Sequence, residues 1–566
     1  MDLTDAQREI VRTEGDFLLL ACPGSGKTRA AAARVMRVAG EPGTKVAACS
    51  YTNVGAERIA SMLEQPLQPK HFVGTVHTLL LRYVVYPFAH LAGAKRGPEL
   101  RHEEWPAQKV YGDRKQRVPL DEFQYDTEGH LVLRRPQRAV KGTSEEIVAS
   151  VESAVKARKK GFFREAGMVS LDDAMWVALT LLRKYPEIAA AFARRFDEIL
   201  VDEAQDTSEL QLACIGELRK TGSLRSLVLI GDLEQSIYSF QGASAEGCRA
   251  LAAERGLREL TLSENHRCSQ KICDAARHFC TRAMADSAVG ETRDCEIDPE
   301  VALYPHDDPE QAMALFRERL EAHQIPTAHA AVLARRRTMV ESLAGTGVKV
   351  DVEQRPARIA RLAVALAEGT LTRSDMRYAE RTVARCAYGD AIGPEDLDDD
   401  ARVALRAAAY RFISALPSLD GDLRTWISGA KEALMAGAAL VADTPATAAG
   451  MLLKSKATHQ TVTVAEVFTP PPRDLVPQTV HSIKGEDREA IMMVVRKPHG
   501  SDPTHQFELF DAIATGTEVS EEAEEERRVT FVALTRARRY CLVALPDTKR
   551  GRAIAEASLA LGFLRV

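Results

Sequence analysis

The chain has 566 residues, more than a single hydrophobic core usually organises, so several folded units are expected. Hydrophobic residues make up 45% and charged residues 27%, as in ordinary globular proteins, and no apolar run approaches the roughly 20 residues that cross a bilayer. The net charge of −5 argues against a protein that merely coats nucleic acid, although a groove can still concentrate positive charge. The N-terminus lacks a secretory pattern, and the ten cysteines form no dense framework. We therefore expect a cytoplasmic protein with reduced thiols and no membrane partner.

Short apolar runs predict buried strands in the first part of the chain, and the first of them is flanked by Gly15 and a glycine-rich loop. These runs are residues 17–21, 46–51, 198–202 and 227–231. Helical patterns lie between them, for example at residues 29–38 and 171–183. Strands that alternate with helices predict a parallel sheet with helices on both faces.

The same rhythm returns in the second part, where strands are predicted at residues 330–334, 478–481, 490–495 and 540–545. We therefore predict two α/β units, each interrupted by an insert. Residues 91–165 contain 16 Lys and Arg against 12 Asp and Glu, so the first insert is locally basic. Residues from about 370 to 470 are rich in alanine, have a helical pattern, and end near three consecutive prolines.

A glycine-rich loop follows the first predicted strand and opens a helix, with the sequence Ala-Cys-Pro-Gly-Ser-Gly-Lys-Thr at residues 21–28. Glycines let the backbone turn tightly, so that its amides can face phosphate groups. Lys27 is expected to reach the β- and γ-phosphates of ATP, and Thr28 to ligate Mg²⁺. A strand before the loop and a helix after it favour nucleotide binding over a simple glycine turn. The predicted nucleotide-binding residues here are Pro23, Gly24, Ser25, Gly26, Lys27, Thr28 and Arg29.

Two adjacent carboxylates, Asp202 and Glu203, stand at the end of the strand predicted at residues 198–202. ATP hydrolysis needs one carboxylate to hold Mg²⁺, and we predict Asp202 for this role. A second carboxylate must orient and deprotonate the attacking water, which suits Glu203. An isolated acidic pair would more often be a solvated turn, but the apolar strand and the phosphate loop favour catalysis.

With these motifs the chain resembles the UvrD/Rep/PcrA-like branch of superfamily 1 helicases. The sequence Asp-Glu-Ala-Gln-Asp at residues 202–206 is similar to the second motif of that family, and further matches follow in order up to residue 545. The resemblance implies an α/β fold with two RecA-like parallel-sheet motor domains, each carrying a mostly helical inserted subdomain. The implied domains are a first motor domain at 1–90 and 166–268 with an insert at 91–165, and a second at 269–369 and 478–566 with a reduced insert at 370–477.

The resemblance also assigns residues to the nucleotide. Gln7 lies in a segment similar to the adenine-reading motif, which places its amide on the base edge. Gln235 would sense the γ-phosphate, and Arg267 and Arg536 would be two arginine fingers, for which a planar and permanently charged guanidinium is well suited. The implied catalytic residues are Lys27, Asp202, Glu203, Gln235, Arg267 and Arg536.

Three positions depart from the usual motifs. His266 stands where the family usually stacks adenine on a tyrosine, and Gln241 replaces a usual arginine. Residues 485–487 read Gly-Glu-Asp where Gly-Leu-Glu is common. We expect His266 to stack on the base, and either Glu486 or Asp487 to contact the ribose, with both possibilities open.

The resemblance further implies contacts with DNA. Aromatic side chains in this family stack on bases, which holds a strand without reading its sequence. The residues expected to contact DNA are Tyr51, Thr52, Asn53, Thr75, His77, Tyr238, Phe240 and His481.

The implied function is an ATP-dependent helicase that uses Mg²⁺, moves 3′ to 5′ on single-stranded DNA, unwinds duplex DNA and works with repair proteins. The alternative is a DNA-stimulated ATPase that regulates a nuclease complex, because the short second insert and residues 75–91 look similar to helicase subunits of Gabija antiviral systems. Such subunits pair with an OLD-like nuclease. Strong unwinding by the isolated chain would favour the first function, and a copurifying nuclease the second.

Overall fold

The computed structural model divides into two compact units, one of residues 1–335 and 478–566 and one of residues 336–477. The residues described are 3–63, 67–101, 105–110, 116–133, 144–237, 242, 244–305, 308–343, 355–367, 369–389, 394, 397, 399–418, 421–447, 449–453, 474–496 and 505–566. Within these residues, no helix combines the length and apolar character that crossing a bilayer requires.

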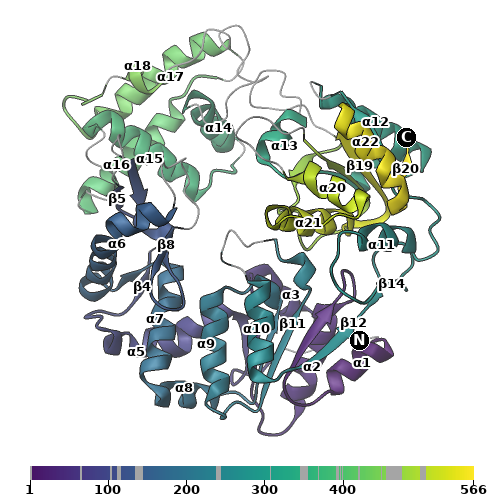
Figure 1. Cartoon of the computed structure of the whole chain (residues 1–566). Coiled ribbons are helices and arrows are strands. Elements are labelled where there is room, and N and C mark those ends of the chain that lie inside the picture. The colour runs from purple at the N-terminus through teal and green to yellow at the C-terminus, as the bar shows by residue number, and fades with distance from the viewer. Residues whose placement is uncertain are drawn as a thin grey trace. The chain divides into compact units, whose positions relative to one another are not determined.

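The first sheet of the larger unit has six strands, and every pairing within it is parallel (Figure 1). In sheet order the strands are β12 (Arg258–Leu262), β1 (Phe17–Ala21), β11 (Ser226–Gly231), β10 (Glu198–Asp202), β2 (Val46–Ser50) and β3 (Phe72–Thr75). The strands predicted at 17–21 and 198–202 are confirmed with the same bounds. Because β11 lies between β1 and β10, the loops that follow these three strands share one edge of the sheet.

Alternating residues of the strands enter two different cores, one on each face of this sheet. Leu18 packs in a core with Ile199 and Leu229, whereas its neighbour Leu19 packs in a second core with Leu200. Burial on both faces explains why these strands are almost continuously apolar. The helices of this part are α1 (Asp5–Arg12), α2 (Lys27–Gly40), α3 (Asn53–Ser61), α4 (Val76–Leu80), α5 (Tyr86–Phe88), α7 (Leu171–Lys184), α8 (Pro186–Ala193), α9 (Glu209–Lys220) and α10 (Ala245–Arg255).

The basic insert has its own small core, which includes Trp105, Phe123 and Val155. It combines the helix α6 (Ser144–Gly161) with short paired strands that the sequence did not predict. Within the insert, β5 (Ala107–Val110) pairs with β6 (Gln116–Pro119) and β7 (Phe123–Tyr125) with β8 (Leu131–Leu133), while β4 (Glu99–Leu100) pairs with β9 (Met168–Val169), which follows the insert.

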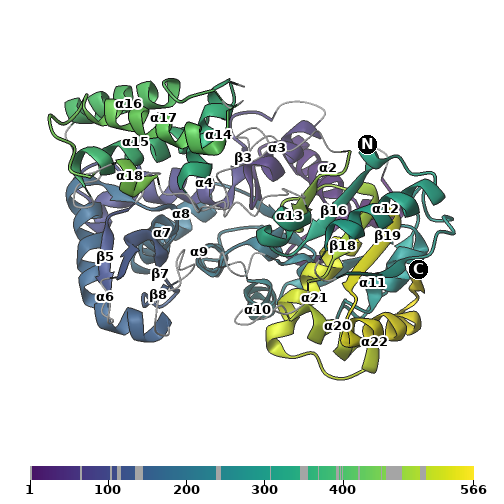
Figure 2. The same cartoon turned by 90° about the horizontal axis from the view of Figure 1, so that it is seen from above.

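A second sheet of six strands belongs to the same unit (Figure 2). Its order is β17 (Pro477–Thr479), β16 (Ala330–Ala334), β18 (Arg488–Val494), β19 (Ala537–Pro546), β15 (Glu300–Tyr304) and β20 (Leu564–Arg565). The strand predicted at 330–334 is confirmed, and the one predicted at 540–545 is longer than expected. Its helices are α11 (Gln270–Arg277), α12 (Glu310–Ala322), α20 (Gln506–Thr515), α21 (Glu521–Leu534) and α22 (Lys549–Ala557). Two parallel α/β sheets confirm the predicted fold class.

The smaller unit is helical in its described residues and has its own core, which includes Val383, Phe412, Trp426 and Leu434. Its helices are α13 (Arg337–Leu343), α14 (Arg355–Ala367), α15 (Arg373–Tyr388), α16 (Asp399–Ser414), α17 (Leu423–Ala438) and α18 (Ala449–Leu452). The unit is inserted between β16 and β17, which are neighbours in the second sheet. The unit begins at residue 336, whereas the insert was predicted to begin at residue 370. The division of the chain into two motor domains with inserts stays a prediction.

Candidate functional site

The glycine-rich loop connects β1 to α2, and both of its glycines have a left-handed backbone, with φ +70° at Gly24 and φ +74° at Gly26. A Cβ atom on Gly24 would lie 2.6 Å from the Cβ of Arg267, and one on Gly26 would lie 2.6 Å from Nε2 of Gln7. Conformation and space therefore both require glycine here. The buried hydroxyl of Ser25 has no hydrogen-bond partner within the described residues, which fits a loop that awaits an acceptor such as a phosphate oxygen.

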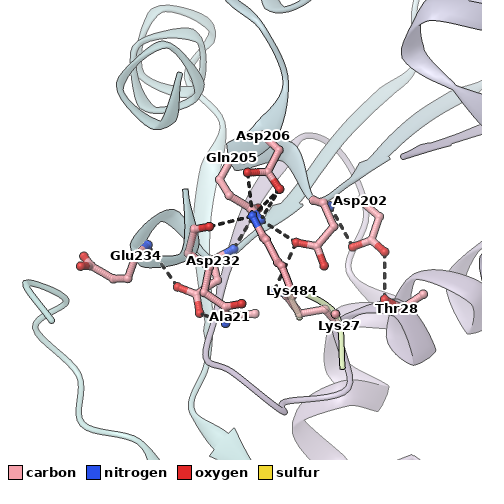
Figure 3. A network of polar contacts seen from close by, with 12 residues as sticks. Ala21, Lys27, Thr28, Asp202, Gln205, Asp206, Asp232, Glu234 and Lys484 are labelled. Carbon is pink, nitrogen blue, oxygen red and sulfur yellow. Dashed lines mark hydrogen bonds and ion pairs between the residues drawn. The ribbon is translucent and has the colours of Figure 1, made fainter. Parts of the chain in front are cut away.

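Lys27 is the first residue of α2 and lies almost fully buried, with its Nζ 3.6 Å from Oε2 of Glu203. Burial lowers the pKa of Lys27, but the negative charges of Glu203, Asp232 and Asp202 outweigh it, and the pKa is raised. The ammonium is therefore firmly charged at neutral pH. Its neighbour Thr28 donates from Oγ1 to Oδ2 of Asp202, over 3.0 Å, so the two predicted Mg²⁺ ligands lie together (Figure 3).

The acidic pair ends β10, and the backbone turns sharply between the two carboxylates. Glu203 has φ +54°, a left-handed conformation that few residues other than glycine adopt. Burial raises the pKa of Asp202, and the charge of Glu203 raises it further. Burial acts in the same direction on Glu203, but the positive charges of Lys27 and Lys484 outweigh it and lower the pKa. Glu203 is thus held ionised, as a group that accepts a proton from water must be.

Gln235 connects the two sheets. Its Nε2 donates to Oδ2 of Asp232 over 2.8 Å, and its Oε1 accepts from Nη2 of Arg536 over 3.0 Å. Arg536 follows α21 in the second sheet region and is fully buried. Burial and the nearby charge of Arg267 lower its pKa, and no carboxylate of the described residues forms an ion pair with it. A buried guanidinium without a carboxylate partner is stabilised by a negative charge that binds beside it.

Arg267 lies next to the segment that carries Arg536, with its Nη1 3.1 Å from the carbonyl oxygen of Thr535. Oδ1 of Asn265 accepts from the backbone N–H of Arg267 and that of Cys268, both over 2.9 Å, which fixes the turn that carries the arginine. The backbone N–H of His266 donates to the carbonyl oxygen of Gly24, over 3.1 Å. The structure therefore brings the predicted arginine fingers and the phosphate loop into one region.

Lys484 is a member of this cluster that the sequence did not assign to the site. Its Nζ donates to both carboxylate oxygens of Asp206, over 2.8 and 2.6 Å, and to the carbonyl oxygen of Gln235, over 2.7 Å (Figure 3). Asp206 and Gln205 were likewise not assigned to the site, and Nε2 of Gln205 donates to Oε2 of Glu203 over 2.5 Å. Lys484 comes from the second sheet region, whereas Asp206 and Gln235 come from the first, so the bonds of Lys484 join the two sheets beside the acidic pair.

Replacing Lys484 by methionine should destabilise the protein, because burial already raises the pKa of Asp206 to about 6 and the mutation removes the cation that offsets this cost. The side chains of Lys484 and Asp206 are 10% and 4% exposed, and removal of one partner from such a buried pair costs about 3–5 kcal/mol. Calorimetry should show a lower melting temperature for K484M, and partial recovery in K484M/D206N, where no charge is left unpaired. An unchanged melting temperature in K484M would contradict the expected effect.

Gln7 uses its side-chain amide within the protein. Its Oε1 accepts from the backbone N–H of Thr4 over 3.2 Å, and its Nε2 donates to the carbonyl oxygen of Ser25 over 2.8 Å. The helix α1 is thereby held against the phosphate loop. Contact with an adenine edge stays a prediction, as does stacking on His266.

The predicted ribose contacts and Arg29 lie nearer the surface than the cluster. Glu486 pairs with Arg488, and Asp487 lies 4.0 Å from Nε of Arg267, so the choice between Glu486 and Asp487 stays open. Arg29 is exposed on the first turn of α2, and Pro23 is buried in the loop.

Five of the predicted DNA contacts lie at the ends of the neighbouring strands β2 and β3. Thr52 caps α3 by accepting from the N–H of Gly55, and Thr75 caps α4 by accepting from the N–H of Thr78. Burial lowers the pKa of His77 to about 4, so its ring is neutral at pH 7. The remaining residues of this set, Tyr51 and Asn53, are partly or largely exposed.

Of the other DNA candidates, His481 lies on the second sheet side, with its Nε2 3.1 Å from the carbonyl oxygen of Ile237. Burial and the charge of Arg335 lower its pKa to about 4. Tyr238 and Phe240 lie outside the described residues, as does Gln241.

Comparison with known proteins yields a family match for the first part of the chain. Residues 3–254 match the model described as the UvrD/REP helicase N-terminal domain. The chain is 27% identical over 296 residues to the ATP-dependent DNA helicase PcrA of Leuconostoc citreum, 27% over 309 residues to UvrD1 of Mycobacterium leprae, and 29% over 291 residues to DNA helicase II of Escherichia coli.

These alignments span 48–50% of this chain but only 38–39% of the length of each relative. They support the resemblance drawn above from the order and content of the motifs.

Proposed function

We propose that this UvrD-like chain, whose residues 3–254 match the model of the UvrD/REP helicase N-terminal domain, is an ATP-driven motor that translocates on single-stranded DNA. The observation that carries the proposal is the polar cluster shared by the two sheets. Lys484 and Arg536 of the second sheet region bind Asp206 and Gln235 of the first, beside the glycine-rich loop. A ligand that changes the charge of this cluster changes what holds the sheets together.

ATP is the ligand that suits the donors of the cluster. The loop offers backbone amides, the buried Ser25 hydroxyl and the charged Lys27, all of which complement phosphate oxygens. Mg²⁺ prefers oxygen ligands, and Thr28 and Asp202 supply a hydroxyl and a carboxylate that already lie 3.0 Å apart. When bound there, the metal would neutralise charge on the phosphates.

We assign the hydrolytic roles to the residues as follows. Glu203 accepts the proton of the attacking water, because Lys27 and Lys484 keep it ionised. Arg267 and Arg536 stabilise negative charge on the γ-phosphoryl group, since their guanidinium groups lie near the loop and Arg536 has no carboxylate partner within the described residues. Gln235 orients Arg536 through its Oε1.

ATP turnover is proposed to alter the link between the sheets and thereby the grip on DNA. The segments at the ends of β2 and β3, together with the region of His481, would hold the strand. The direction, 3′ to 5′, and the unwinding of duplexes are proposed from the resemblance to the motor family. In this proposal the segments 91–165 and 370–477 are the inserts of the two motor domains, with duplex DNA and repair proteins as partners.

Single-stranded DNA should stimulate ATP hydrolysis by this chain about tenfold or more, because strand binding on one edge of the sheets and closure of the ATP site are linked. Steady-state ATPase assays with and without an oligonucleotide measure this effect. An ATPase rate indifferent to DNA would remove the basis for a translocase.

Helicase assays on 3′-tailed, 5′-tailed and blunt duplexes then test direction and unwinding. Separation of 3′-tailed duplexes alone is the expected result. DNA-stimulated hydrolysis without strand separation would instead favour the regulatory ATPase of a nuclease complex.

A further inference from the structure

A short segment between α11 and β15 returns to the first sheet. The helix α11 packs in the core of the second sheet through Ile272. Shortly after it, Thr281 donates from its N–H and its Oγ1 to the two carboxylate oxygens of Glu234, over 3.2 and 2.5 Å. The segment therefore crosses from one sheet to the 3-10 turn that also carries Gln235.

Arg282, the next residue, is almost fully enclosed, with its side chain 12% exposed. Its Nη1 donates to the carbonyl oxygen of Ala21, over 3.2 Å, and to Oδ1 of Asp232, over 3.4 Å. Its Nη2 binds Oδ1 of Asp286. One guanidinium thus contacts the last residue of β1, where the phosphate loop begins, and the carboxylate that holds Gln235.

Asp232 is 1% exposed and uses both carboxylate oxygens. Oδ1 accepts from Arg282 and from the N–H of Glu234, and Oδ2 accepts from Nε2 of Gln235. An amide side chain can present either its oxygen or its nitrogen to a neighbour, since the two ends have nearly the same shape. Because Asp232 accepts a hydrogen bond from Nε2 of Gln235, Oε1 of Gln235 faces Arg536 and accepts from it. If the amide were flipped, its NH2 group would face the N–H donors of Arg536.

We propose that Arg282 is a positioning residue of the ATP site, which fixes Asp232 so that Gln235 presents its oxygen to Arg536. The inference rests on the proposed function, because the reaction it supports is ATP hydrolysis. Arg282 contacts the loop only at the carbonyl oxygen of Ala21 and, among the described residues, has no hydrogen bond to the acidic pair, so it acts through Asp232 and Gln235. Its contact with Ala21 makes this arrangement sensitive to the position of the phosphate loop.

Arg282→Gln should lower kcat for DNA-stimulated ATP hydrolysis about 10–100-fold, the usual effect of removing a residue that orients a reacting group, and change KM for ATP by less than about threefold. Arg282→Lys should recover part of the loss, because an ammonium keeps the charge but not the fork that serves two oxygens. Arg293→Gln is the matched control, since Arg293 lies later in the same segment and its side chain is 57% exposed. It should behave as wild type.

A double-mutant cycle with Asp232→Asn decides whether Arg282 acts through Asp232. The expected result is that Arg282→Gln adds little to the kcat loss of Asp232→Asn. Independent effects that multiply, or a normal kcat in Arg282→Gln, would overturn the inference. A loss in Arg282→Gln that appears wholly in KM would also do so.

Melting temperatures of all variants show whether they fold. If Arg282→Gln does not fold, the same cycle is read with Arg282→Lys. Absence of ATPase in the wild-type chain would contradict the proposed function itself, whereas wild-type activity with an inert position 282 would contradict only the present inference.

Discussion

Glu203→Gln should bind ATP at least as tightly as the wild-type protein and hydrolyse it about 10²–10⁴-fold more slowly, the range expected when a general base is lost. Glutamine keeps the shape of the side chain but cannot take a proton from water. It also removes the carboxylate that lies 3.6 Å from Lys27, the largest of the negative charges that compete with the phosphates for the ammonium.

Titration with a fluorescent ATP analogue and single-turnover hydrolysis separate these two effects. Glu209→Gln is the matched control, because Glu209 is an exposed residue at the start of α9. Normal single-turnover hydrolysis by E203Q would exclude Glu203 as the base. Loss of ATP binding with folding intact would show that the residue does something other than chemistry.

Lys27→Ala should abolish measurable ATP hydrolysis and weaken ATP binding strongly. The ammonium is a buried cation close to Glu203, Asp202 and Asp232, and the phosphates of ATP would bring more negative charge to the same place. Loss of one partner in a buried charge cluster costs about 3–5 kcal/mol, which is about 10²–10⁴-fold at 1.36 kcal/mol per factor of ten.

Equilibrium binding and steady-state ATPase assays measure the effect of K27A on kcat/KM. Lys220→Ala serves as the control, because the side chain of Lys220 is 58% exposed and, among the described residues, forms its ion pair with Glu217 on the same helix. A kcat/KM within tenfold of wild type in K27A would rule out the proposed ATP site.

The fold could be predicted largely because its strands are buried on both faces. Residues 17–21 are a continuous apolar run, and residues 198–202 have an apolar centre between Glu198 and Asp202. A strand covered on both sides by helices has no solvent-facing side to interrupt such a run. The strands β7 and β8 could not be predicted because they are too short. They have only three residues each, and a run of that length carries no usable period.

The local parts of the site could be predicted, but its long-range bonds could not. Lys27 and Glu203 belong to motifs whose spacing carries the chemistry, whereas Lys484 and Asp206 are separated by 278 positions, and nothing in either segment names the other as partner. Arg282 lies outside every motif that was recognised. Its contact with Asp232 depends on a return of the chain between two sheets, which only the fold reveals.

The sequence around Gln7 contains the pattern of a helix cap, which the prediction of a base contact did not use. A threonine followed three residues later by glutamine is the pattern of a helix capping box, and Thr4 and Gln7 form one at the start of α1. The resemblance directed attention to a base contact, while the sequence also predicted this local role. The helix cap uses Oε1 of Gln7, while Nε2 already donates to the carbonyl oxygen of Ser25 in the loop. A base contact would therefore have to share at least one of these two atoms.

The helical unit leaves the second sheet after β16 and rejoins it at β17, the strand next to it. A unit inserted between two neighbouring strands must have its own first and last residues close together. The length and sequence of that unit are otherwise free to vary while the edge of the sheet stays intact. A helical unit of another length or sequence could therefore take this place without any change to the six-stranded sheet.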